Sequence, residues 1–349
     1  MCGRIKIKKE FVKVGYELGT GTEVKIPMSH TIVTGVSQHS GKTTAIEGIV
    51  NRLPEQYKVV VFNTKPDEQC FKGNNIPLFF KYSRNWQFIE GLLSLSLGKK
   101  LNDKYVSLII SYSENTKSME GFYLNICEGL HKTKIIGDRD VLTVMKAQLE
   151  IIMPKLEQIK YSTKLELPYK INVIDLTEQD LTIQSIVMNS VLEEVLTTQK
   201  YTVIVLPELW KFAPQIQNMP TKIAIETFIR QGASNKNFII ADSQDLANVS
   251  KAIIKQCTTY ILGYQSEFNE IRHTILQIFD KFGHNITPDT IMSLKIGQFY
   301  VVNKDTVKKV YAQPVFLDDF HSETLAKGKE AVEELLFAIE TFKKAKTLS

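Results

Sequence analysis

GVSQHSGKTT, residues 35–44, is the stretch that decides the fold of this chain. The short apolar run HTIVT precedes it and predicts a buried strand, and KTTAIEGIVNRL continues from it with apolar residues spaced along one helix face. A glycine-rich turn between a strand and a helix points backbone N–H groups toward the helix N-terminus, where they hold phosphate groups. The stretch therefore predicts a phosphate-binding loop for a nucleotide.

The residues of this loop have separate tasks in holding ATP and Mg²⁺. We expect Lys42 to neutralise the terminal phosphates and the Thr43 hydroxyl to bind Mg²⁺. The usual pattern has a glycine where this chain has Val36, and Gly35 lies one residue earlier, which predicts one extra residue or a different turn. A chance GKT before an ordinary helix is the alternative, and the flanking strand and helix argue against it. The predicted nucleotide-binding residues are Gly35, Gln38, His39, Ser40, Gly41, Lys42, Thr43 and Thr44.

Beyond the loop, buried strand patterns alternate with helical ones. Strands are predicted at 4–17, 22–27, 30–34, 58–62, 170–176, 201–206, 237–241, 258–263, 297–303 and 307–313. Helices are predicted at 42–53, 181–197, 221–231 and 266–280. This alternation predicts an α/β fold with a mostly parallel central sheet covered by helices.

Two other segments are predicted to be helical. Residues 84–165 form a largely helical insertion, and residues 323–346 have the pattern of one long amphipathic helix. The chain lacks an internal repeat and a low-complexity linker. We therefore expect one domain over 1–320, which includes the insertion, and a C-terminal helix within 321–349.

The composition is that of a soluble globular protein, which we expect to be cytoplasmic. Hydrophobic residues make up 43% of the 349 residues and charged residues 23%, and the net charge of +5 permits contact with nucleic acid without arguing for it. The four cysteines have neither metal-ligand nor redox spacing. The N-terminus lacks the apolar core of a signal peptide, and no apolar run approaches the roughly 20 residues that span a bilayer.

A second candidate site lies at the end of another predicted strand, YTVIVLPE, which ends at Glu208. We expect Glu208 to act as the general base that activates the attacking water. Pro207 stands where an aspartate usually supports Mg²⁺, so the ion would depend on Thr43, phosphates, waters or a carboxylate from elsewhere. The alternative for Glu208 is a solvated residue after a strand. We expect Trp210 and Phe212, which follow, to pack a helix onto the sheet rather than to stack on a base.

In combination, these motifs resemble the HerA/FtsK superfamily of ring ATPases, and most closely the HerA-type DNA translocases. The resemblance covers residues 15–315. It is carried by GVSQHSGKTT, KVVVFNTKPDE, KINVIDLT, ELWKFAP, FIRQGASNKNFIIADSQ, KQCT and LKIGQFYVVNKD, in that order.

The resemblance implies a RecA-like core and a homo-oligomeric, hexameric ring that hydrolyses ATP at subunit interfaces and translocates double-stranded DNA. It implies that Gln244 is the sensor of the γ-phosphate. Arg230 matches the first arginine of the family's REGR segment, either as an arginine finger or as an ion-pair residue, while Ala233 replaces the second. Lys65 matches the family's DPKGE-like segment.

Several alternatives remain open at this stage. HerA translocases begin with a small β-barrel that docks partners such as a nuclease, and residues 1–27 are too short for one. We therefore expect a reduced relative, and viral packaging and plasmid conjugation ATPases of the superfamily are alternatives. Pro207, Ala233 and the altered loop favour another alternative, an ATP-binding assembly or switch subunit with slow or no hydrolysis. A motor that acts on protein is the third.

Overall fold

The computed structural model describes residues 10–36, 40–65, 71–83, 85–157, 161–216, 218–284 and 286–337. The chain divides into two compact units. The first unit comprises residues 1–57, 240–247 and 257–349, and the second comprises 58–239 and 248–256. The predicted division into a domain over 1–320 and a C-terminal helix stays a prediction.

The first unit is built on a mixed sheet with the strand order β2-β1-β13-β12-β11-β3-β10. β3 pairs in parallel with β10 on one side and with β11 on the other, and the remaining strands pair antiparallel. Every residue of β3 is buried, as expected for a strand covered on both faces. The strands are β1 (Phe11–Glu17), β2 (Glu23–Pro27), β3 (Thr31–Thr34), β10 (Phe238–Ser243), β11 (Thr259–Leu262), β12 (Gln298–Asn303) and β13 (Thr306–Ala312).

The first unit also contains short helices. They are α1 (Lys42–Asn51), α10 (Phe268–Glu270), α11 (Leu276–Lys281), α12 (Pro288–Met292) and α13 (Asp319–Lys327). A π-helical turn, Ile271–Ile275, joins α10 to α11. Within the described residues, the prediction of one continuous helix over 323–346 is wrong. α13 ends at Lys327, and Gly328 has φ 109° and ψ −167°, which breaks the helix before helical residues resume at 329–337.

The second unit has a parallel sheet with the order β9-β4-β8-β5 and a separate two-stranded sheet of β6 and β7. The strands are β4 (Lys58–Asn63), β5 (Asn74–Asn75), β6 (Leu78–Phe79), β7 (Tyr161–Ser162), β8 (Ile171–Asp175) and β9 (Thr202–Leu206). β9 is buried along its whole length, which agrees with its unbroken apolar run. The predicted α/β class with a mostly parallel sheet is confirmed.

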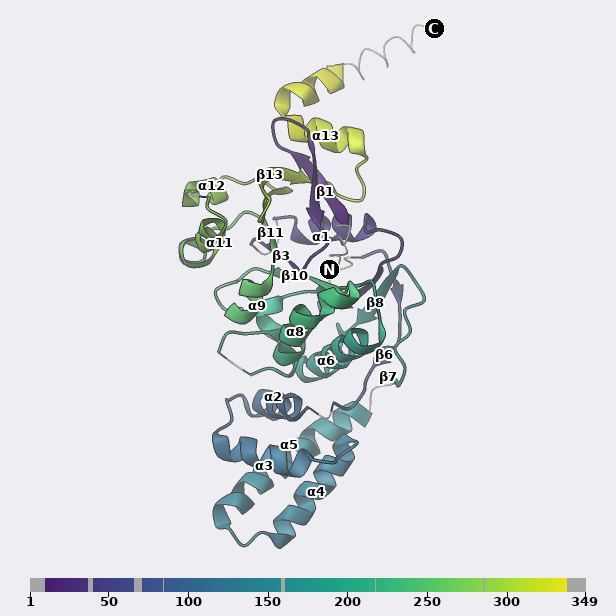
Figure 1. Ribbon diagram of the computed structural model, residues 1–349, viewed down its shortest axis with the longest axis vertical. Helices are drawn as coiled ribbons and strands as arrows, with labels where there is room; N and C mark the ends of the chain where they lie inside the picture. The colour runs from purple at the N-terminus through teal and green to yellow at the C-terminus, as the bar shows by residue number, and fades with distance from the viewer. Residues whose placement is uncertain are drawn as a thin grey trace, which may run out of the picture. The chain divides into compact units, whose positions relative to one another are not determined.

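Helices of the second unit include the predicted insertion, α2 (Trp86–Leu97), α3 (Asp103–Ser113), α4 (Met119–Lys132) and α5 (Ile136–Glu157), which lie together in Figure 1. Local sequence sets where they begin, since the side chains of Asn85, Asn102 and Ser118 each accept a hydrogen bond from a first-turn backbone N–H. The remaining helices are α6 (Leu181–Thr198), α7 (Leu209–Phe212), α8 (Pro220–Gln231), the 3₁₀ turn Gly232–Asn235 and α9 (Lys251–Gln256).

The insertion contacts α8 through a close backbone approach at Gly91. A Cβ atom at this position would lie 2.7 Å from the Pro220 nitrogen and 2.8 Å from its Cα. Both are backbone atoms of α8 that cannot turn aside. Glycine at position 91 therefore allows α2 to pack against the start of α8.

We expect Gly91→Ala to lower the free energy of unfolding by roughly 1–3 kcal/mol, because the added methyl group forces the two helices apart. The matched control is Gly121→Ala in α4, where a Cβ would meet only the Ser118 hydroxyl, at 3.4 Å. The control should stabilise the chain by up to about 1 kcal/mol, since alanine favours a helix over glycine. Urea unfolding followed by circular dichroism measures both, and equal effects would contradict the close approach.

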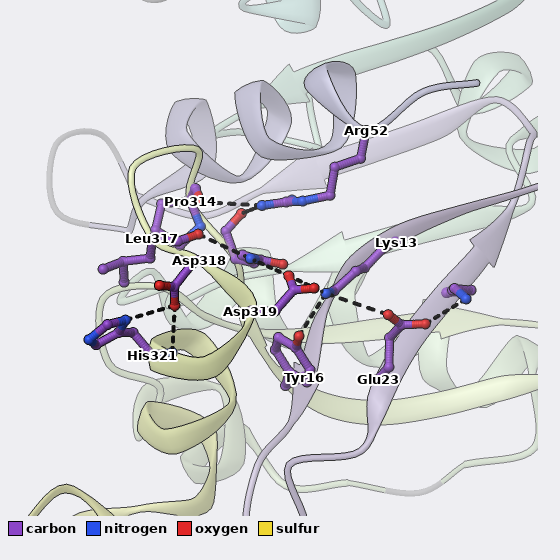
Figure 2. Close-up of polar contacts among 11 residues, drawn as sticks. Lys13, Tyr16, Glu23, Arg52, Pro314, Leu317, Asp318, Asp319 and His321 are labelled. Carbon is purple, nitrogen blue, oxygen red and sulfur yellow. Dashed lines mark hydrogen bonds and ion pairs between the residues drawn. The ribbon is translucent and has the colours of Figure 1, made fainter. Parts of the chain in front are cut away.

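A polar network joins α13 to β1 in the first unit (Figure 2). The Lys13 ammonium donates to Asp319 Oδ1 at 2.8 Å and to the Tyr16 hydroxyl at 2.7 Å. The Gln313 amide also donates to Asp319 Oδ1, at 2.9 Å. Nearby, the Arg52 guanidinium at the end of α1 donates to the Gln313 and Pro314 carbonyls. The network therefore ties the start of α13 to β1 and β13.

The hydrogen bond from Lys13, and then that from Gln313, lower the pKa of Asp319 to about 2. The pair therefore stabilises the folded chain fully above the ordinary pKa of 3.8, and this stability is lost as the pH falls toward 2. An NMR titration should place the Asp319 midpoint near 2, and Lys13→Met should move it up toward 3.8. Lys25→Met is the control, since Lys25 pairs with Glu23 rather than with Asp319; an equal upward shift in this variant would contradict the assignment.

Candidate functional site

The loop between β3 and α1 closes around two glycines. Gly41 caps α1 with φ 79°, a left-handed conformation that favours glycine. A Cβ atom at Gly35, where φ is 154°, would lie 2.9 Å from the Ser40 Cβ. The buried Ser40 hydroxyl donates to the Val36 carbonyl at 3.0 Å, so this hydrogen bond joins the two described ends of the loop. The two glycines thus permit a turn that other residues would strain or obstruct.

Lys42, the first residue of α1, contacts the start of this turn. Its ammonium donates to the Gly35 carbonyl at 2.7 Å and to the Val36 carbonyl at 2.8 Å, and the residue is only 8% exposed. The described start of the loop therefore contacts the lysine although Val36 occupies the position of the usual glycine. This arrangement presents a fixed positive charge at the N-terminus of a helix that has no acidic residue in its first turn.

The other predicted residues of the loop divide into two groups. Thr43 and Thr44 lie half-buried in the first turn of α1. Gln38 and His39 lie outside the described residues. The polar groups at the start of α1 fit a Mg²⁺–nucleotide. The first-turn N–H groups and the lysine ammonium can bind phosphates, and one threonine hydroxyl is enough for the ion because Mg²⁺ takes most of its remaining ligands from phosphates and water.

Gln244 emerges from the sheet next to this loop. β10 and β3 are parallel neighbours, and Ser243 pairs directly with Thr34. Gln244 and Gly35 therefore follow paired residues at the carboxyl edge of the same sheet, the edge where α/β proteins bind ligands. The structure thus brings the predicted sensor and the phosphate loop together within the first unit.

In the second unit, Glu208 is a buried carboxylate with two lysine partners. Glu208 Oε1 lies 3.0 Å from the Lys65 ammonium, and Oε2 pairs with Lys211. Its backbone is left-handed, with φ 48° and ψ 51°, which is unusual for a residue with a side chain. The glutamate side chain is 8% exposed, so the alternative of a solvated residue after the strand is wrong.

The sequence singled out Lys65 only by resemblance, and it did not predict that Lys65 contacts Glu208. Val61 of β4 pairs with Val205 of β9, so the segments that follow the two strands leave the same edge of the sheet. Lys65 follows the first strand and Glu208 the second. A lysine just after a predicted strand could have indicated a partner for Glu208. Using this indication requires knowing that β4 and β9 are neighbours, and the sequence does not show the strand order.

Other residues singled out by the sequence have ordinary structural surroundings. Arg230 forms a 3.5 Å ion pair with Glu226 on its own helix, and its side chain is 58% exposed. Phe212 is fully buried, as expected for packing. Cys257 of the KQCT segment is buried, and the burial raises the pKa of its thiol to about 12, which keeps it protonated. Across the described residues, no cluster of three or more His, Cys, Asp or Glu side chains could hold a metal ion, and no helix is long and apolar enough to span a membrane.

Comparison with known proteins identifies the architecture. No family model matches the chain, and neither does any curated protein. Among solved structures, VirB4 of Thermoanaerobacter pseudethanolicus is similar, with a TM-score of 0.63, 14% identity, and 87% of this chain and 97% of that chain covered. The plasmid coupling protein TrwB, solved in complex with ADP and Mg²⁺, gives a TM-score of 0.63 at 11% identity, with 90% and 97% covered.

The fold is that of a RecA-like P-loop NTPase. The RecA-like core that the sequence resemblance implied is therefore confirmed. At these identities the likeness extends to the fold alone. It does not single out the HerA-type translocases, so this finer relationship stays a prediction.

We expect Lys65→Met to lower the free energy of unfolding by roughly 1–3 kcal/mol, because it removes one partner of a buried carboxylate. Adding Glu208→Gln should recover most of the loss, since a neutral amide no longer needs the ammonium group. The control is Lys164→Met, which breaks a pair whose side chains are 80% and 67% exposed and should cost less than about 1 kcal/mol. Urea titration measures the three variants beside the unmodified chain, and a loss in Lys65→Met no larger than that of the control would contradict the importance of the pair.

Proposed function

We propose that this chain is an ATPase whose subunits form a homo-oligomeric ring, a hexamer, and move double-stranded DNA. One observation carries the proposal: the loop carbonyls of Gly35 and Val36 hold the Lys42 ammonium at the head of α1. A helix N-terminus with an adjacent fixed cation suits the phosphates of ATP. We propose that Gln244, which follows the neighbouring strand β10, distinguishes ATP from ADP.

The proposed reaction is the hydrolysis of the terminal phosphoanhydride of ATP. A water oxygen forms a bond to the γ-phosphorus while the bond from that phosphorus to the β–γ bridging oxygen breaks, which yields ADP and phosphate. Glu208 takes the proton of the water. Thr43 would help to hold Mg²⁺, which would supply positive charge opposite the phosphate oxygens.

Glu208 must change its partners to act as a base. In this structure its two oxygens face the ammonium groups of Lys65 and Lys211. A carboxylate oxygen that faces an ammonium group is not open to a water molecule, so release from at least one lysine would accompany turnover. The proposed base is therefore restrained in this conformation.

DNA as the moving partner is supported by the motif order that resembles HerA/FtsK ATPases and by the fold shared with TrwB, a plasmid coupling protein, and with VirB4. The same fold likeness favours a conjugation ATPase as much as a HerA-type translocase. Arg230, 58% exposed at the end of α8, is proposed to complete a neighbouring subunit's site. We place the activity in the cytoplasm, with a nuclease or another DNA-processing protein as partner.

An ATP-binding assembly or switch subunit is the second candidate function. It is favoured by Pro207, which has no side-chain ligand for the metal, and by the two lysines that restrain Glu208. Such a protein would bind ATP tightly and hydrolyse it slowly or not at all.

ATP turnover with and without double-stranded DNA tests the proposal. We expect DNA to stimulate turnover, Lys42→Ala to abolish nucleotide binding, and Glu208→Gln to bind ATP while turning over roughly 100-fold or more slowly. Glu166→Gln is the matched control, because the Glu166 side chain is 67% exposed. This variant should behave as the unmodified chain does.

A rate of ATP turnover that DNA does not change, or that Glu208→Gln does not lower, would contradict the proposal of a DNA motor. Tight binding with negligible turnover in the unmodified chain would favour the switch subunit. Electron microscopy with an ATP analogue and DNA would count the subunits of the ring and show whether DNA passes through it.

A further inference from the structure

A segment that follows β11 contacts both nucleotide-reading loops of the first unit. We call residues 263–270 the strap. The Gly263 N–H donates to the Thr34 carbonyl at 2.8 Å, and the Val36 N–H donates to the Tyr264 carbonyl at 2.9 Å. A Cβ atom at Gly263 would lie 2.8 Å from Phe299 and 3.0 Å from the Thr34 carbonyl oxygen. The strap therefore lies directly against the start of the phosphate loop.

The next residue of the strap contacts the predicted sensor. The Gln265 amide nitrogen donates to the main-chain carbonyl of Gln244 at 3.0 Å. Its amide oxygen accepts from the Ser266 N–H at 3.1 Å, which fixes the orientation of the amide. Gln265 is only 3% exposed. Consecutive residues of the strap, 264 and 265, thus contact the phosphate loop and the sensor.

Glu270 fixes the chain just beyond the sensor. Its carboxylate accepts from the Leu246 N–H at 2.7 Å and from the Ala247 N–H at 3.0 Å. On the other side of Gln244, the Ser243 hydroxyl donates to the Asp245 carbonyl at 2.8 Å. The backbone around Gln244 is therefore held from the strap and from within its own turn.

Glu270 is buried, with 5% exposure, although it ends a short helix near the surface. Burial raises the pKa of Glu270, while the two amide hydrogen bonds lower it. A buried carboxylate is costly unless its oxygens are satisfied, and here the sensor turn supplies the donors. The glutamate is thus matched to this backbone conformation of residues 246 and 247.

We propose that Gln265 and Glu270 are positioning residues that set the sensor Gln244 relative to the phosphate loop, so that the strap couples the two loops when the terminal phosphate is read. This inference rests on the proposed function, in which Gln244 reads that phosphate. To distinguish ATP from ADP, a side chain must be held within a fraction of an ångström of its position beside the γ-phosphate. Such precision comes from neighbouring residues that hold that side chain in place.

The test compares Glu270→Ala and Gln265→Glu with Glu267→Ala as a matched control. Glu267 lies on the same strap, is exposed, and caps α10 by accepting from the Asn269 N–H at 3.0 Å. Gln265→Glu keeps the size of the side chain and removes the donor to Gln244. Circular dichroism and the melting temperature establish which variants fold; if Glu270→Ala does not fold, Gln265→Glu carries the test.

Affinities for ADP and for ATPγS are measured for each variant, together with kcat and KM for ATP. We expect Glu270→Ala and Gln265→Glu to bind ADP within about twofold of the unmodified chain, and to lose roughly three- to tenfold of the preference for ATPγS over ADP. kcat should fall by a similar factor while KM changes little. Glu267→Ala should retain both the preference and the rate.

A double-mutant cycle with Gln244→Ala separates positioning from general destabilisation. If Glu270 acts through Gln244, adding Glu270→Ala to Gln244→Ala should cause no further loss of preference. Additive losses, or a preference that survives both strap variants, would overturn the inference while the proposed ATPase stands. A chain that discriminates ATPγS through the strap but does not hydrolyse ATP would support the inference and overturn the ATPase, and a chain that binds neither nucleotide would overturn both.

Discussion

The parallel pairing of β3 with β10 on one side and with β11 on the other is the constraint on which the first unit's site depends. Thr34 pairs with Ser243 in one neighbour and with Leu262 in the other. Three segments therefore leave the sheet at the same level: the phosphate loop, the Gln244 turn and the strap. In a parallel sheet the carboxyl ends of neighbouring strands share one edge, so this register alone gathers residues more than 200 positions apart in sequence.

The phosphate loop shows how such a site tolerates a departure from the usual pattern. The loop needs backbone carbonyls around the lysine and a left-handed residue at the helix start, rather than a glycine at one fixed position. Gly41 meets the second requirement, and the carbonyls of Gly35 and Val36 meet the first. With the first glycine moved by one residue, the ammonium still has two backbone carbonyl partners.

In the second unit, the main constraint is the unfavourable burial of a charged carboxylate. Glu208 is buried and has a left-handed backbone, and each feature is unfavourable by itself. Lys65 and Lys211 offset the buried charge from two sides. The same contacts that stabilise the carboxylate also restrain its chemistry, so stability and the proposed base function oppose each other at this residue.

The sequence by itself determined the loop, the helix that follows it and most of the strands, because these depend on local periodicity and on glycine at positions such as Gly41. It also placed Glu208 at the end of a predicted strand, and the family resemblance singled out Gln244. Only the tertiary structure decided the strand order, the contact of Lys65 with Glu208, and the hydrogen bonds of Gln265 and Glu270 to the turn after β10. It also showed the helix break at Gly328. The physical reason is that periodicity reports which face of an element is buried, whereas strand order and register are set by packing between segments distant in sequence.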